Sequence, residues 1–70
     1  RDMRLQRYRN VAETLTSQGW RVLRQVSESH EIWCASDGIT KVVVPRHREV
    51  AAGVLRRIAE RLESVPGSWR

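Results

Sequence analysis

The feature that most constrains the fold is a run of three strand-like segments lying between two segments of helical periodicity. The three segments are rich in β-branched and aromatic residues and are separated by polar turns. Asp37-Gly38 is a strong signal for a two-residue turn, and Pro45 should end the third strand because it cannot donate to a β-ladder. The sequence therefore predicts three antiparallel strands, at residues 20–26, 29–35 and 39–44.

Helical periodicity flanks the predicted sheet on both sides. Residues 1–18 open with a basic segment, 1–4, and then carry apolar residues at the spacing of one buried helix face. Gly19 suits the left-handed position just past a helix end, and residues 48–63 repeat the helical pattern. Gly53 inside the second pattern indicates either a close approach to the sheet or a helix that begins near it. The apolar stripe of the first predicted helix consists of Leu5, Tyr8, Val11, Ala12 and Leu15. That of the second consists of Ala51, Val54, Leu55, Ile58 and Leu62.

This order of elements predicts an α+β fold, a two-layer sandwich of order α-β-β-β-α. A chain of 70 residues allows one domain with one small core, so we expect a single domain over residues 1–70. Pro66-Gly67-Ser68 ends the ordered pattern, and residues 64–70 are predicted to be a flexible tail. In such a tail Trp69 would be exposed and able to stack on a nucleic-acid base.

The net charge of +5 and the pI of about 11.0 favour a polyanionic or acidic protein partner. All basic residues except Lys41 are arginine, which suits bidentate phosphate contacts, although codon bias explains that preference equally well. No apolar run is long enough to cross a membrane, and no segment resembles a signal peptide. With Cys34 as the only cysteine, the expected location is the cytoplasm.

His30 is the histidine whose surroundings most favour chemistry. It is predicted to start a strand beside a turn, opposite a strand that carries Arg21 and Arg24. Strand alternation separates it from Trp33, so His30 faces outward if Trp33 belongs to the core. A neutral imidazole there can take the proton of an RNA 2′-hydroxyl, which then attacks the adjacent phosphate without a metal. The alternative interpretation is a strand-start histidine with no role.

His47 is the second candidate, in the run Val44-Pro45-Arg46-His47-Arg48. It is a candidate for the general acid that protonates the leaving oxygen, for a phosphate ligand with Arg46 and Arg48, or for a residue that only begins a helix. Arg24, Lys41 and Arg46 are candidates for neutralising charge that develops on phosphorus, or else belong to a solvated basic face.

Two other kinds of site are excluded. His30, Cys34 and His47 lack the tight ligand pairing of a zinc site. Ser29 and His30 are adjacent on a strand and point to opposite faces, so they cannot form a triad with Asp37. A Gly-rich phosphate loop is absent from the sequence.

Several short motifs, taken in order, resemble HicA-type (YcfA-like) toxins over about residues 8–62. The resemblance implies a fold similar to the double-stranded-RNA-binding domain and mRNA cleavage that needs no metal or small-molecule cofactor. It places His30 on the family's catalytic histidine and implies a HicB-type antitoxin as the protein partner, with no membrane association. The RNA would be bound through Arg21, Arg24, Ser29, Lys41, Arg46 and His47. The motifs are Gly19-Trp20, Arg24-Gln25, Ser29-His30, Trp33, Asp37-Gly38, Val44-Pro45-Arg46-His47, Glu49-Val50, and Gly53-Val54-Leu55 with Ile58.

The sequence departs from the family pattern in three places, one of which is the C-terminal tail after Leu62, which does not follow the pattern. Glu28 stands where the family turn has glycine, and this turn is one residue longer. The link between His47 and Gly53 is about two residues shorter than the pattern. A non-catalytic RNA-binding or protein-interaction module on the same fold is therefore the alternative function. A DNA-binding repressor has less support because no helix-turn-helix spacing is present.

Overall fold

The computed structural model describes residues 3–70, so the first half of the predicted basic segment 1–4 lies outside the described residues. Its elements form the predicted α+β architecture, with two helices and a three-stranded antiparallel sheet. In chain order they are β1 (Gln6–Arg7), α1 (Tyr8–Ser17), β2 (Arg21–Ser27), β3 (His30–Cys34), β4 (Lys41–Pro45), β5 (Glu49–Val50), α2 (Ala52–Ala59) and the 3₁₀ turn η1 (Gly67–Trp69).

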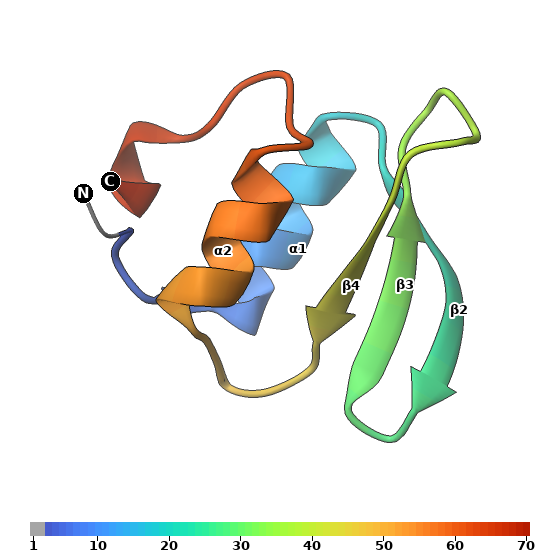
Figure 1. Ribbon diagram of the computed structural model, residues 1–70, viewed down its shortest axis with the longest axis horizontal. Coiled ribbons are helices and arrows are strands. Elements are labelled where there is room, and N and C mark those ends of the chain that lie inside the picture. Colours follow the sequence, from blue (N-terminus) through green and yellow to red (C-terminus); the bar gives the residue numbers. More distant parts are fainter. Residues whose placement is uncertain (1–2) are drawn as a thin grey trace.

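The main sheet has the order β2-β3-β4, which makes β3 the central strand (Figure 1). Both neighbours of β3 are antiparallel to it, and His30 at its start lies opposite Ser27 on β2 and Pro45 on β4. β4 ends at Pro45, one residue beyond the predicted end of the third strand, and begins at Lys41 rather than at residue 39. The sheet therefore fixes His30 at one end of its central strand.

Both helices lie to one side of the sheet, nearest to β4, while β2 is the strand farthest from them (Figure 1). Strand alternation places Trp33, Val42 and Val44 on the face that packs against them, and these side chains are buried. His30 and Val43 lie on the opposite face and are exposed. The helices contribute the buried side chains Val11, Leu15, Leu55, Ile58 and Ala59.

Both helices begin later than predicted because short strands precede them. Residues 6 and 7 pair with Glu49–Val50 instead of extending α1, and Leu5 is 59% exposed rather than on the buried stripe. The second helix begins at Ala52, so the explanation of Gly53 as a residue near a helix start is confirmed. A two-residue strand carries no periodicity of its own, which is why these pairings were not predicted.

The turn at Asp37-Gly38 is a four-residue loop rather than the predicted two-residue turn. Cys34 pairs with Lys41, and the amide of Ala35 donates to the carbonyl of Thr40, which leaves residues 36–39 in the loop. The Asp37 carboxylate accepts hydrogen bonds from the Thr40 hydroxyl and from the amides of Ile39 and Thr40. These bonds lower the pKa of Asp37, and the bond from the Thr40 hydroxyl contributes most.

The prediction of a frayed C-terminus is wrong for Trp69. Its side chain is 1% exposed and belongs to the hydrophobic core, so it cannot stack on a nucleic-acid base. The amide of Arg4 donates to its carbonyl at 2.7 Å, and Gln6 Nε2 donates to the carbonyl of Ser68 at 3.0 Å. The last turn thus packs beside the segment that precedes β1 (Figure 1).

Candidate active site

His30 is exposed at the first position of β3, where its ring is held by two serines. Its Nδ1 lies 3.1 Å from Ser27 Oγ and 3.2 Å from Ser29 Oγ. The prediction that Ser29 and His30 point to opposite faces is wrong, because Ser29 lies in the turn before β3 and strand alternation does not apply to it. Among residues 3–70, Nε2 of the ring has no hydrogen-bond partner. When Nδ1 carries the proton and donates it to a serine oxygen, Nε2 keeps a free lone pair. That tautomer is the one a general base requires.

The arginines of β2 do not lie directly opposite His30. Ser27 lies opposite His30, whereas Arg24 pairs with Ile32 and Arg21 with Cys34. Cys34 also pairs with Lys41, so Arg21 and Lys41 lie four residues along the sheet from His30, or about 13 Å at a strand's rise per residue. His30 therefore lies beside the strand that carries both arginines, as predicted, but Arg21 is at the opposite end of that strand from Ser27.

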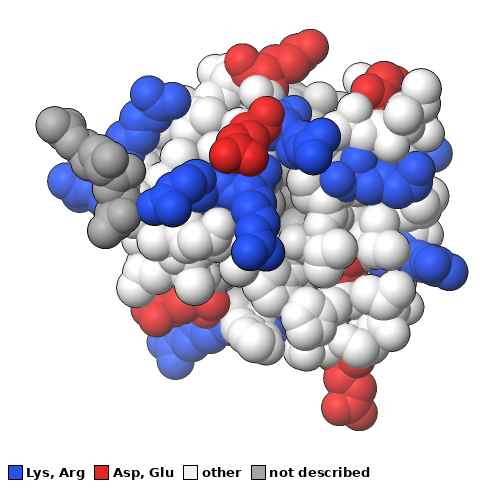
Figure 2. All heavy atoms as spheres, in the orientation of Figure 1, with Lys and Arg blue, Asp and Glu red and all other residues white. Residues whose placement is uncertain are grey.

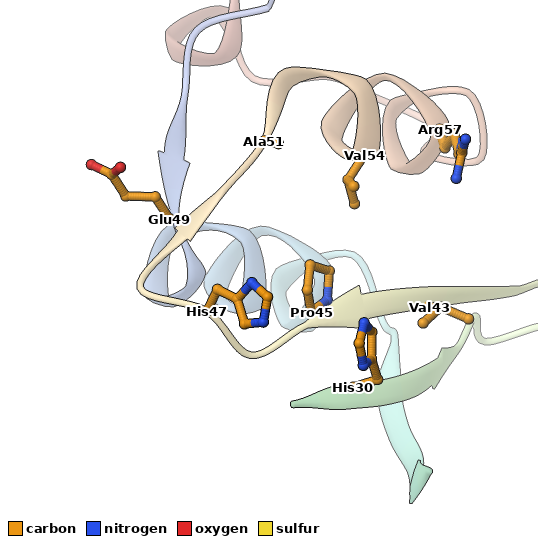
Figure 3. Close-up of a pocket in the computed structure, with 8 residues that line it drawn as sticks. All are labelled: His30, Val43, Pro45, His47, Glu49, Ala51, Val54 and Arg57. Atoms are coloured by element: carbon orange, nitrogen blue, oxygen red, sulfur yellow. The ribbon is translucent and has the colours of Figure 1, made fainter. Parts of the chain in front are cut away.

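His47 lies close to His30, on the loop between β4 and β5. The ring centroids are 6.1 Å apart and the ring planes are inclined by 62°. Both rings line a cavity of about 350 Å³ between α2 and the β3–β4 end of the sheet, with Val54 of α2 on its opposite wall (Figure 3). The other residues of its wall are Val43, Pro45, Glu49, Ala51 and Arg57.

A backbone hydrogen bond ties together the chain segments that carry the two histidines. The amide of Arg46 donates to the carbonyl of Ser29 at 2.6 Å. These residues directly precede His47 and His30 in the chain. The separation of the two imidazoles is therefore set by the sheet and by this bond, not by side-chain contact alone.

Arg46 takes part in a partly buried polar cluster and does not line the first cavity. Its Nε lies 3.5 Å from Glu31 Oε2, and its guanidinium stacks on the Tyr8 ring at 5.7 Å. Glu31 is 7% exposed and also accepts hydrogen bonds from the Tyr8 hydroxyl at 2.6 Å and from Trp33 Nε1 at 3.1 Å. Burial and the bond to Glu31 raise the pKa of Tyr8 to about 12, although Arg46 opposes the shift.

A second cavity of about 280 Å³ continues along α2 and β4 from the first. The two cavities share Val43, Val54 and Arg57 in their walls. Lys41 and Arg61 line the second one, together with Glu60. The face in Figure 2 carries basic side chains interspersed with acidic ones in its upper half, and much of its lower half is uncharged.

The structure thus brings together three of the predicted site residues, Ser29, His30 and His47. Sequence reasoning missed Arg57, which is not part of the apolar stripe predicted for the second helix, and it missed the cluster of Tyr8, Glu31 and Arg46. Within the described part of the chain, no three His, Cys, Asp or Glu side chains converge as a candidate metal site. No helix there is long and apolar enough to span a bilayer.

Comparison with protein families identifies the chain. The family described as the HicA toxin of bacterial toxin-antitoxin matches residues 8–63, well over half of the sequence. The chain belongs to the HicA toxin family. Comparisons with curated proteins and with solved structures gave no significant match. HicA toxins are generally endoribonucleases that act on RNA and have an antitoxin partner. The matched segment includes both histidines and the whole cavity between them.

Proposed function

We propose that this HicA-family protein is an mRNA interferase, a metal-independent endoribonuclease in which His30 is the general base. The observation that carries the proposal is the exposed imidazole of His30, which lines an open cavity while two serine hydroxyls hold its Nδ1. A general base must be fixed by one nitrogen and free at the other, and this ring meets both conditions.

In the proposed reaction, His30 Nε2 takes the proton of a ribose 2′-hydroxyl as that oxygen attacks the adjacent phosphorus. Ser27 and Ser29 accept from Nδ1–H and thereby keep the ring in the tautomer that leaves Nε2 unprotonated. Proton transfer by a positioned side chain contributes about 10²–10⁴-fold to a rate. This step requires no metal because the imidazole itself supplies the base.

We infer that the RNA lies along the two joined cavities between α2 and β4. Arg57 borders both cavities, and Lys41 and Arg61 line the second, so cationic groups follow the groove away from His30. Ser29, Arg46 and His47 remain proposed RNA ligands at the His30 end. Arg21 and Arg24 on β2 would contact RNA only outside the groove.

The proposed protein partner is a HicB-type antitoxin that covers His30. The net charge of +5 supports an acidic surface on that partner, because opposite charges favour association. An mRNA substrate and such a partner would both be met in the cytoplasm. The alternative function, a non-catalytic binding module, draws support from Glu28, whose carboxylate in the turn before Ser29-His30 would repel phosphate.

The decisive experiment is incubation of the purified protein with mRNA in EDTA. We expect cleavage by the unaltered protein and a loss of about 10²–10⁴-fold in rate for His30→Ala. Induction of the same variant in cells should no longer arrest growth. Since His30 is exposed, the substitution should leave the unfolding transition almost unchanged.

Arg9→Ala is a matched control, because Arg9 is exposed on α1 and lines neither cavity. It should cleave like the unaltered protein. Full cleavage by His30→Ala would refute the assignment of the base. Intact RNA that is retarded in a salt-sensitive manner would instead favour the binding module.

A further inference from the structure

The first cavity contains two histidines, His30 and His47, which could carry out two separate proton transfers. Cleavage at a phosphodiester needs a proton removed from the 2′-oxygen and a proton delivered to the departing 5′-oxygen. In an in-line displacement these oxygens lie on opposite sides of phosphorus, and each needs its own donor or acceptor within about 2.6–3.2 Å. One imidazole cannot reach both at the same time.

The separation of the two rings suits this requirement. Their centroids are 6.1 Å apart, and the rings are inclined rather than stacked. They are not hydrogen-bonded to each other, and the space beside them is open cavity (Figure 3). A phosphate held there would have one imidazole near each of the two oxygens.

The surroundings of the two rings differ in a way that assigns the roles. His30 has one nitrogen held by serine hydroxyls, as a base requires. The exposed side chain of His47 makes no hydrogen bond within residues 3–70, so both of its nitrogens are available to carry and deliver a proton. Glu49 also borders the cavity, but its carboxylate points away from both imidazoles (Figure 3). Among the described residues that line this cavity, no carboxylate therefore competes for the proton that His47 would donate.

We propose that His47 is the general acid of the cleavage step, a proposal that rests on the ribonuclease function above. His30 Nε2 takes the 2′-hydroxyl proton, and the 2′-oxygen forms its bond to phosphorus. The bond from phosphorus to the 5′-oxygen breaks, and that oxygen keeps the electron pair and takes a proton from the His47 imidazolium. The products are a 2′,3′-cyclic phosphate and a 5′-hydroxyl, with His30 protonated and His47 neutral.

The test compares two oligonucleotides that differ in the leaving atom. Each carries one ribonucleotide among deoxynucleotides, at a site first mapped with the unaltered protein, and the scissile bond leads either to the normal 5′-oxygen or to a bridging 5′-sulfur. A thiolate leaves without protonation, so it makes a general acid unnecessary. We expect His47→Ala to cleave the oxygen substrate about 10²–10⁴-fold more slowly and the sulfur substrate at nearly the unaltered rate.

His30→Ala should be slow on both substrates because the base is needed for each. Arg48→Ala alters the same loop outside the cavity lining and should leave the ratio of the two rates unchanged. An equal loss on both substrates, or no loss at all, for His47→Ala would overturn the general-acid role while leaving the ribonuclease function intact. Failure of the unaltered protein to cleave either substrate would overturn both proposals.

Discussion

At the scale of single residues, the most unusual feature is the carboxylate of Glu31 inside the core face of the sheet. A buried carboxylate is costly unless it is paired and hydrogen-bonded. Here Tyr8, Trp33 and Arg46 all supply partners. Because Arg46 directly precedes His47, the cluster anchors the chain beside the proposed general acid.

The raised pKa of Tyr8 predicts a loss of stability in alkali. The folded protein keeps the phenolic proton up to about pH 12, whereas the unfolded chain loses it near pH 10. The stabilisation is therefore complete below about pH 10 and is lost as the pH rises towards 12. Denaturant titrations from pH 7 to pH 12 should show the free energy of unfolding falling in that window.

Tyr8→Phe provides the comparison because it keeps the ring and removes the hydroxyl. At pH 7 it should cost about 1.5–3 kcal/mol, the range for a hydrogen bond to a charged group. Above pH 10 the difference between the two proteins should shrink, since the unaltered protein then loses the same interaction. A constant difference from pH 7 to pH 12 would contradict the assignment.

Sequence alone predicted the outward orientation of His30 but not its environment. Alternation from Trp33 gave the outward orientation of His30, which depends only on local strand geometry. Tyr8 was assigned to the buried stripe of the first helix, but its hydroxyl bonds to a carboxylate 23 residues away in the sequence. Such a pairing depends on tertiary packing, and periodicity carries no information about it.

At the scale of elements, α2 has a role that its sequence pattern did not indicate. Its apolar stripe was predicted from helical spacing, and Leu55 and Ile58 are indeed buried. The same spacing placed Arg57 only on the remaining surface of the helix. Arg57 lines both cavities because α2 lies against the free edge of β4. A sequence pattern does not reveal which strand a helix will face.

Replacing Arg57 should therefore weaken RNA binding more than replacing a basic residue elsewhere. A phosphate contact to single-stranded nucleic acid contributes about 0.7 to the slope of log affinity against log salt concentration. We expect Arg57→Ala to reduce that slope by about this amount, measured by fluorescence anisotropy in the His30→Ala background to prevent cleavage.

Arg21→Ala and Arg9→Ala are the comparison variants for this measurement. Each removes one positive charge, so net charge is matched, but neither residue lines the groove. Both should leave the salt slope nearly unchanged. A larger effect for Arg21→Ala than for Arg57→Ala would place the RNA across β2 instead.

At the scale of the whole molecule, the C-terminal turn completes the core. Trp69 is the largest fully buried side chain and belongs to the core cluster that also includes residues of both helices and of the sheet. The sequence led us to expect a free tail because Pro66-Gly67-Ser68 interrupts any regular pattern. A tryptophan that returns to the core after such a break has no periodic neighbours by which it could be recognised.

Trp69→Ala should consequently destabilise the protein by about 3–5 kcal/mol, the usual cost of truncating a buried aromatic residue. A 70-residue domain has a total stability of only about 4–10 kcal/mol, so this change could unfold much of the population. Thermal unfolding followed by circular dichroism would measure it. Ile39→Ala is the control, because that side chain is 78% exposed and should matter little. Equal stability of the two variants would show that the last turn is not part of the core.

The position of β2 has a further consequence. Every residue of this strand is exposed, including Val22, Leu23 and Val26, and within residues 3–70 one of its edges has no neighbouring strand. Open strand edges with apolar side chains are templates on which copies of a protein aggregate. Arg21 and Arg24 place like charges along this edge, so two copies that approach edge to edge repel each other. These arginines would thus reduce aggregation of the concentrated protein through β2, whether or not they contact RNA.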